Sequence, residues 1–289
     1  MAAQGKQVKL VEKAATTTFS FSVENHAGMQ QLGSKSAKGH SLDDLLEMQV
    51  NAEAMANEQG LSCVSTELYH LNPALEGDHP PAENAYVLVI RHGASLMLGA
   101  TDATHKDILR EYEAELSNLE VDKKALMRGR VVNKHARWNV CFDTNAQEAD
   151  IAEGKGTVVP FDEVPYTQRI RDILPLLHAS LANIKAEYND YYDISKCGIG
   201  YHGDSERREV VAVRVGAAMP LYYQWFHRSN PVGPRQMIPL NGDDLYVMSE
   251  KAVGTDWKKS SQMTLRHSAG CDKFTVLKPE RPTIVPQML

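Results

Sequence analysis

The sequence has few cysteines, no long apolar run and no strong excess of one charge, and each absence excludes a class of protein. Its four cysteines are widely spaced and form no Cys-x-x-Cys pair, which argues against a structural zinc site and provides no disulfide framework. No apolar stretch approaches the roughly 20 residues that span a bilayer, and no apolar core follows the N-terminus as in a secretory signal. We therefore expect an intracellular protein without a membrane partner.

The charge balance alone does not identify a partner. The net charge is -6 over 289 residues, which is not typical of a nucleic-acid-binding protein. Residues 200–289, however, carry 12 Lys and Arg against 9 Asp and Glu, a local charge of +3. A locally basic face can hold phosphates, and the alternative is a solvated surface of mixed charge.

Hydrophobic patterning divides the chain into three segments. Residues 1–40 are expected to be a flexible N-terminal segment apart from one strand at 18–23. Residues 41–120 are expected to form a mixed α/β extension with a helix between the N-cap Ser41 and Gly60. In residues 121–289 we predict a helix from Thr167 to about Ala186, followed by the short strands Glu209–Val215, Pro220–Phe226, Arg235–Leu240, Leu245–Met248 and Lys273–Leu277. Such closely spaced strands predict a mainly β (α+β) protein, with a sandwich or barrel and flanking helices.

One short stretch, Gly198–Glu206, carries candidate metal ligands. His202 and Asp204 are two positions apart, so in a strand both side chains point to the same side, and Glu206 follows on that face. An imidazole and a carboxylate suit a first-row divalent metal. Two histidines and one carboxylate on one face of an octahedron leave positions open on Fe(II) for dioxygen and a co-substrate. A chance surface pair is the alternative reading of this tripeptide.

Four features in a fixed order make the chain from about residue 120 onward resemble the AlkB-type branch of the Fe(II)- and 2-oxoglutarate-dependent dioxygenases, with the TET/JBP-type base hydroxylases as second choice. The resemblance implies a double-stranded β-helix (jelly-roll) domain over residues 121–289. The features are Pro165-Tyr166 with Arg169–Leu174, Asn189-x-Tyr191, Ile199–Glu206 and Gly242–Met248.

The resemblance implies that iron is held by His202, Asp204 and a distal histidine. Where the family has Trp-x-His, this chain reads Trp257-Lys258-Lys259, and a lysine binds a metal only when it is deprotonated. We expect His267 to be the third ligand, with His227 as the alternative.

The resemblance also implies a co-substrate site. Asn189 and Tyr191 are expected to bind 2-oxoglutarate. Where the family has an arginine-rich last core strand, this chain has Asp272–Lys278, so Lys273 is the expected cation. Arg266 and Arg281 are its competitors.

The implied reaction uses dioxygen and 2-oxoglutarate to demethylate or hydroxylate a base in DNA or RNA. Glu206 is expected to contact the base, Arg207 to meet phosphate, and Arg137 and Trp138 to line the substrate cleft by phosphate contact and stacking. A solvated Glu206 and a packed Trp138 are the alternatives. Oxidation of a 5-methylpyrimidine, of a protein or of a small molecule also remains open. So does a binding module that has lost its metal, as Lys259 would allow. The sequence does not indicate the oligomeric state.

Overall fold

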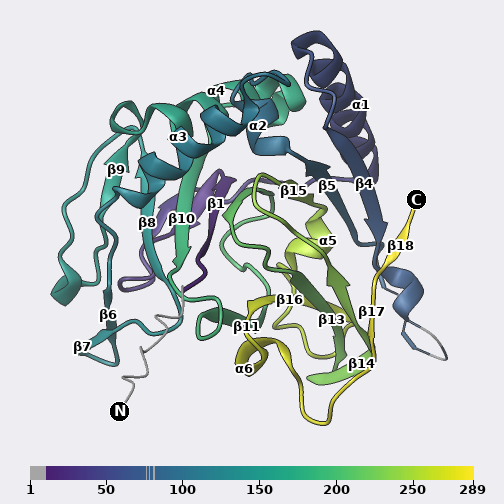
Figure 1. Cartoon of the computed structure of the whole chain (residues 1–289). Helices are drawn as coiled ribbons and strands as arrows, with labels where there is room; N and C mark the ends of the chain where they lie inside the picture. The colour runs from purple at the N-terminus through teal and green to yellow at the C-terminus, as the bar shows by residue number, and fades with distance from the viewer. Residues whose placement is uncertain (1–10, 76, 78, 81) are drawn as a thin grey trace, which may run out of the picture.

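The structure, a computed structural model, describes residues 11–289 except 76, 78 and 81, and its main body has three layers (Figure 1). The α-helices are α1 (Leu42–Gln59), α2 (Gly93–Met97), α3 (His105–Ser117), α4 (Pro165–Leu177), α5 (Glu250–Val253) and α6 (Asp272–Thr275). The short 3-10 helices are η1 (Asn72–Ala74), η2 (Ile151–Glu153), η3 (Phe161–Glu163) and η4 (Ala179–Leu181). None of the helices in these described residues is long and apolar enough to cross a membrane.

Two sheets face each other, and two separate hairpins flank them. The nine-stranded sheet has the order β18 (Gln287–Met288), β4 (Ser65–His70), β5 (Tyr86–Arg91), β15 (Leu245–Met248), β12 (Val210–Gly216), β1 (Ala14–Ser20), β10 (Lys185–Tyr191), β8 (Trp138–Asp143) and β9 (Val158–Pro160). The five-stranded sheet has the order β11 (Gly198–His202), β16 (Thr264–Gly270), β13 (Leu221–His227), β14 (Asn230–Ile238) and β17 (Thr283–Ile284). The hairpins are β2 (Ser22–Glu24) with β3 (Gln31–Gly33), and β6 (Lys124–Met127) with β7 (Arg130–Asn133).

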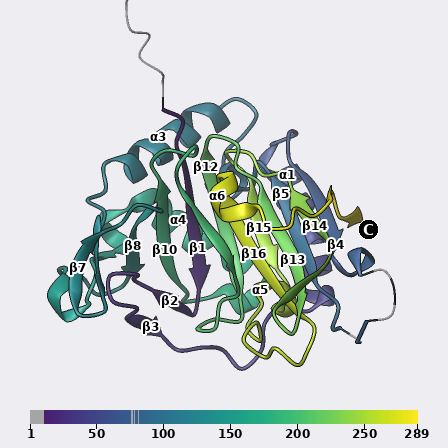
Figure 2. The ribbon, with the colours of Figure 1, turned by 90° about the horizontal axis from the view of Figure 1, so that it is seen from below.

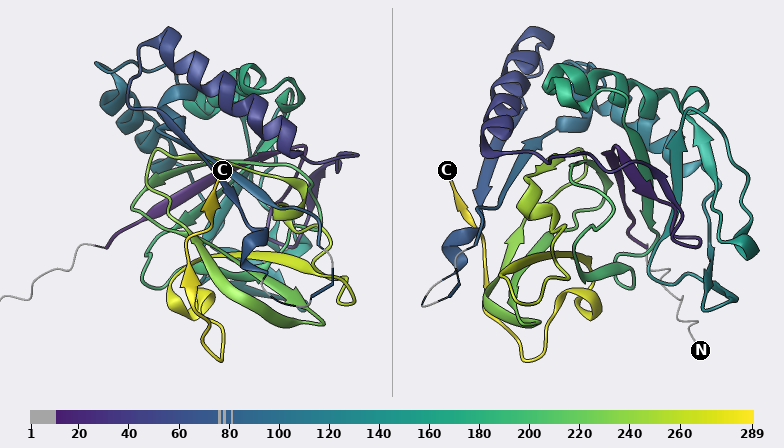
Figure 3. Two further views of the ribbon diagram at one scale, coloured as in Figure 1. Left: turned by 90° about the vertical axis from the view of Figure 1, so that its right-hand side faces the viewer. Right: turned by 180° about the vertical axis from the view of Figure 1, so that it is seen from behind.

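Helices α1 to α4 gather on one face of the nine-stranded sheet, and the five-stranded sheet lies on the other side (Figures 1 and 3). Two apolar cores hold these layers together. The core under the helices includes Leu45, Phe19 and Val213. The core between the sheets includes Tyr223, Trp225 and Leu265. Burial of apolar surface on both faces explains why the central strands are rich in Val, Ile and Leu.

Three antiparallel pairs are nested in the chain, and a fourth brings in the N-terminal strand. β13 pairs with β14, and β12 pairs with β15. β11 pairs with β16, and β10 pairs with β1. The partner of β10 comes from the N-terminal end of the chain, and this strand, β1, lies between β10 and β12 in the nine-stranded sheet (Figure 2). The N-terminal strand is therefore part of the main body.

Alternation along the strands decides which side chains face the space between the sheets. On β12, Val211, Val213 and Val215 belong to the core under the helices. The residues between them point the opposite way, toward the five-stranded sheet, and Arg214 is one of these. The alternation therefore places the charged side chain of Arg214 on the same face of β12 as Val210 and Ala212, which belong to the apolar core between the sheets.

Several predictions for single elements are confirmed. The helix after Ser41 is α1, and its capping box between Ser41 and Asp44 is present. The strand predicted at Leu245–Met248 is β15 with the same bounds. A mainly β protein with flanking helices is also what the structure contains.

Two predictions are corrected. The helix from Thr167 ends at Leu177, and strand β10 begins at Lys185. The segment Lys273–Leu277 is not a strand, because Asp272–Thr275 forms the short helix α6. Strands from all three predicted segments share the nine-stranded sheet, since β1, β4 and β5 belong to it together with β10 and β12. The predicted flexible segment falls in part on residues 1–10, which lie outside the described residues.

Candidate active site

A cavity of about 410 Å³ lies between the two sheets. One wall comes from the nine-stranded sheet, through β1, β10, β12 and β15. The opposite wall comes from β11 and β16 of the five-stranded sheet, and the loop after β11 closes one side. Polar side chains line several sides of this cavity. Hydrogen bonds to them can fix the orientation of a bound ligand.

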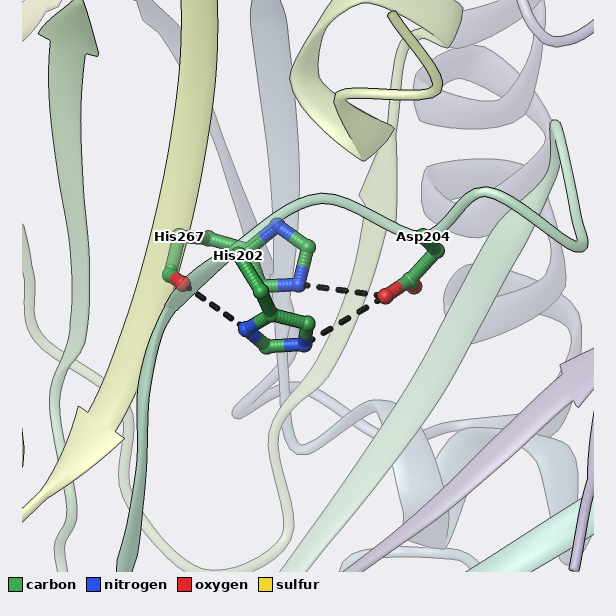
Figure 4. A group of neighbouring side chains, drawn as sticks. All are labelled: His202, Asp204 and His267. Atoms are coloured by element: carbon green, nitrogen blue, oxygen red, sulfur yellow. Dashed lines mark hydrogen bonds and ion pairs between the residues drawn. The ribbon is translucent and has the colours of Figure 1, made fainter. Parts of the chain in front are cut away.

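His202, Asp204 and His267 form a cluster at the cavity wall (Figure 4). His202 on β11 and His267 on β16 are directly opposite each other in the strand register. Asp204 Oδ1 lies 3.4 Å from His202 Nε2 and 3.7 Å from His267 Nε2. These separations are longer than ordinary hydrogen bonds. For comparison, two neighbouring ligand atoms that each lie about 2.1 Å from the same metal ion are about 3.0–3.4 Å from each other. The three donor atoms therefore fit a shared metal ion.

Neighbouring backbone groups hold these ligands in place. His202 Nδ1 lies 2.8 Å from the Gly200 carbonyl oxygen and 3.1 Å from that of His267, which leaves Nε2 as the lone-pair nitrogen facing the cluster. Asp204 N donates to the Val253 carbonyl at 3.0 Å. The intervening residue must be glycine, because a Cβ on Gly203 would lie 2.1 Å from the Gly254 carbonyl oxygen.

The protonation states also suit a metal site. Burial lowers the pKa of His267 to about 4, so its imidazole is neutral at neutral pH. Burial raises the pKa of Asp204, but the nearby His267, Arg207 and His202 together bring it below the ordinary value. Neutral imidazole and ionised carboxylate are the forms that bind divalent metals.

Arg214 is a buried cation without a protein partner in the described residues. Its side chain lines the cavity, and the residue is only 1% exposed. Its Nε and Nη1 have no hydrogen-bond partner, and no described carboxylate lies within ion-pairing distance. Burying an unpaired charge costs several kcal/mol, so this arrangement points to an anion that binds from the cavity.

A row of three polar residues crosses the cavity face of the nine-stranded sheet. Thr16 on β1 is the register partner of both Asn189 on β10 and Arg214 on β12. Thr16 Oγ1 is buried and also has no hydrogen-bond partner among the described residues. A hydroxyl beside a guanidinium can donate to the same carboxylate, and a guanidinium can bind a carboxylate through two parallel bonds.

The amide of Asn189 and the side chain of Arg137 belong to a second polar cluster on the same wall. Arg137 Nε donates to Asn189 Oδ1 at 2.6 Å, and Asn189 Nδ2 donates to Glu187 Oε1 at 2.8 Å. His26 Nε2 lies 2.8 Å from Glu187 Oε1. Glu187 is 2% exposed, and although burial raises its pKa, His26 and Arg207 hold it well below the ordinary value.

The structure places the predicted substrate residues differently from one another. Arg137 and Glu206 line the cavity, and burial raises the pKa of Glu206. Arg207 also borders the cavity, but its guanidinium forms ion pairs with Glu187 at 2.7 Å and Glu206 at 2.8 Å. Its side chain therefore stabilises the cavity wall. Trp138 is not among the lining residues, because its ring stacks on Tyr192 with centroids 4.1 Å apart.

The predicted co-substrate residues are also only partly brought together. Asn189 and Tyr191 line the cavity. Lys273 does not, because it lies exposed on helix α6. Its competitors are absent from the lining as well: Arg266 packs over Phe226 at 4.1 Å, and Arg281 lies near the C-terminus.

Among the distal histidines, the structure brings His267 to the cluster and leaves His227 at the end of β13, opposite Asn230. Lys259 is exposed in the loop before β16, so it does not occupy a ligand position. The candidate third ligand, His267, therefore lies on β16, after the loop that carries Lys259.

Sequence reasoning missed Arg214, Thr16, Glu187 and His26. For Arg214 a signal was present: it is a lone cation in the apolar run Val210–Val215, where a buried charge needs an explanation. Thr16 gave no such signal, because its neighbours across the sheet are about 170 and 200 positions away in the chain.

The chain has an extensive match to one viral protein. It is 47% identical over 265 residues to "Uncharacterized protein R156" of Acanthamoeba polyphaga mimivirus, and the match covers 91% of this chain and 98% of that protein. No family model matches the sequence.

Proposed function

The chain belongs to the same family as uncharacterized protein R156 of Acanthamoeba polyphaga mimivirus, and for this chain we propose the activity of an Fe(II)- and 2-oxoglutarate-dependent dioxygenase that oxidises a nucleic-acid base. One observation carries the proposal: a cluster of two histidines and one carboxylate opens onto the same cavity as an unpaired buried arginine. The first is a ligand set for Fe(II), and the second is an anchor for a carboxylate.

His202, Asp204 and His267 would hold the iron. Three protein donors on one side leave the cavity side free for co-substrate and dioxygen. When bound, iron and 2-oxoglutarate supply the oxidising power, as 2-oxoglutarate and dioxygen are converted to succinate and CO2 and one oxygen atom enters a substrate C–H bond. The part of the protein is to orient the reactants and keep water from the site.

Arg214 replaces Lys273 as the proposed cation for the distal carboxylate of 2-oxoglutarate. Its side chain is buried and unpaired, and Thr16 Oγ1 beside it can donate to the same carboxylate. Tyr191 and Tyr246 also line the cavity. Asn189 contributes indirectly in this proposal, since Arg137 and Glu187 already occupy its amide.

The strand topology supports the jelly-roll form of the proposal. Nested antiparallel pairs that alternate between two facing sheets are what a long hairpin produces when it is rolled up. Here β11–β16, β12–β15 and β13–β14 form such a set. Strand β10, which precedes β11, pairs with β1 where the next nested pair would lie, so the proposed jelly roll includes residues outside the predicted domain 121–289.

The polar groups that line the cavity near Glu206 and Arg137 favour a nucleic-acid base as the substrate. Glu206 keeps one carboxylate oxygen beyond its bond to Arg207, and Arg137 borders the same space. A carboxyl group can accept from the exocyclic amine of a base, and a base that reaches a cavity of this size must leave its stack. The carboxylates of Glu24 and Glu206, which both line the cavity, favour a cationic small molecule or lysine side chain as the second candidate.

The proposal is tested by incubation of the protein with Fe(II), 2-oxoglutarate and oligonucleotides that carry N-methylated bases. We expect succinate to form and the oligonucleotide to lose a methyl group or gain one oxygen, both detected by mass spectrometry. The matched control is Asp204→Asn, which keeps the shape of the ligand and removes its charge. Product from the variant at the wild-type level, or no succinate from the wild type with any substrate, contradicts the proposal.

A further inference from the structure

The hairpin β6–β7 and the residues beside it carry a concentrated positive charge. Residues 123–137 include six Lys and Arg and no Asp or Glu, in a chain whose net charge is -6. Lys123, Lys124, Arg128 and Arg130 are exposed. The six cations are Lys123, Lys124, Arg128, Arg130, Lys134 and Arg137. None of them forms an ion pair within 4.0 Å with any residue that the structure describes. We call residues 123–137 the basic hairpin.

The basic hairpin is a defined ribbon. Its strands pair from Lys124 with Asn133 to Met127 with Arg130, and the turn residues Arg128 and Gly129 both have positive φ, 51° and 74°. This is the backbone of the tight turn that matches the twist of a two-stranded ribbon. Met127 is 60% exposed and Val131 48% exposed. The ribbon lies at the periphery of the molecule (Figures 1 and 2). Lys124, Arg128 and Arg130 are exposed, as are these two apolar side chains.

The base of the basic hairpin touches the wall of the cavity. Leu126 N donates to the Ala27 carbonyl at 2.5 Å, next to His26, which lines the cavity. The Ala136 carbonyl accepts from Gly198 N at 2.9 Å, at the start of the strand that carries His202. Arg137, the last cation of the hairpin, lines the cavity itself. A polymer bound along the hairpin would therefore reach the site.

We infer that the basic hairpin binds the phosphate backbone of a single-stranded nucleic acid. The exposed cations can neutralise successive phosphates, and the neighbouring Met127 and Val131 offer apolar contact to bases. The Trp138 ring, with Lys123 Nζ 4.6 Å from its centroid, extends this surface at the hairpin base. Only the choice of a single strand rests on the proposed function. A base in a single strand can enter the cavity without the free-energy cost of opening a duplex.

The test is fluorescence anisotropy of a labelled oligothymidylate of about 15 nucleotides, titrated with metal-free protein between about 50 and 200 mM salt. The variant combines Lys124→Gln, Arg128→Gln and Arg130→Gln. We expect its affinity to be at least about tenfold lower and its log K versus log salt slope to be smaller by about 2, because each lost phosphate contact removes about 0.7. A control variant with Lys38→Gln, Lys106→Gln and Lys278→Gln, all exposed and outside the hairpin, should bind like the wild type.

Three results would overturn the inference. The wild type could fail to bind the oligonucleotide, or the control variant could lose as much affinity as the hairpin variant. The third is that poly-glutamate displaces the labelled oligonucleotide as well as unlabelled oligonucleotide does at the same concentration of negative charge. The last result would assign the hairpin to an acidic protein. Thermal unfolding of both variants verifies that they fold. Because metal and 2-oxoglutarate are absent from the assay, its outcome is separate from that of the oxygenase test.

Discussion

Replacement of Arg214 by methionine is expected to abolish binding of 2-oxoglutarate while it leaves the ligand-free protein at least as stable as the wild type. The guanidinium is buried without a partner in the described residues, so its charge is a cost in the empty protein and a strong contact once a carboxylate binds. Methionine is apolar and of similar length, and it removes both effects. Loss of a buried charged contact corresponds to about 3–5 kcal/mol, or at least about 100-fold in affinity.

The measurement is anaerobic calorimetric titration of 2-oxoglutarate with Mn(II) as the metal, together with urea unfolding of the ligand-free variant. Lys273→Met is the matched control, because it removes an exposed cation that lies outside the cavity. Arg214→Lys should bind with intermediate affinity, since lysine retains the charge and loses the two parallel bonds. Loss of binding in the Lys273 variant, or wild-type affinity in Arg214→Met, would assign the anchor elsewhere.

Replacement of His267 by alanine is expected to eliminate metal binding, and replacement of His227 is not. His267 supplies one of three donors around a shared point, and His227 lies at the end of β13 outside the cluster. Removal of outer contacts to a metal ligand lowers metal affinity about 10–100-fold, so loss of the ligand itself should exceed that range. Succinate formation should fall in parallel.

Thermal unfolding with and without Mn(II) measures this difference directly. A metal at about 100 times its dissociation constant stabilises the folded state by about 2.7 kcal/mol. The wild type and His227→Ala should show this stabilisation, and His267→Ala should lose it. Metal stabilisation that disappears in His227→Ala and persists in His267→Ala would show that another set of ligands binds the ion.

The local parts of the structure could be predicted from the sequence, because local interactions determine them. The start of α1 follows from the capping box of Ser41 and Asp44. His202 and Asp204 are two positions apart, so their closeness follows from their short separation in the chain, although Asp204 lies just beyond the end of β11. His267 could be proposed but not distinguished from His227, since only the pairing of β11 with β16 places it opposite His202.

The proposed co-substrate anchor, Arg214, stands out in the sequence as a lone cation in an apolar run, but its place in the cavity could not be predicted, because that place depends on which strand completes the sheet. Lys273 was expected because Asp272–Lys278 stands where the resemblance implies the last core strand. In the structure the strand between β10 and β12 is β1, from the other end of the chain, and Asp272–Thr275 forms α6. Pairings between strands far apart in sequence leave no local pattern. Trp138 was misplaced for a similar reason, since its stacking partner Tyr192 comes from the turn after β10.

The most direct test of the central claim, that one cavity holds both iron and 2-oxoglutarate, is a visible absorption spectrum recorded as Fe(II) and then 2-oxoglutarate are added to the wild-type protein without oxygen. Chelation of the iron by 2-oxoglutarate within the protein should give a broad charge-transfer band that is absent with either component alone and disappears on exposure to air as succinate forms. The band should be absent in Asp204→Asn and in Arg214→Met at the same concentrations. A wild-type spectrum that shows no such band, with no succinate after air is admitted, would contradict the claim.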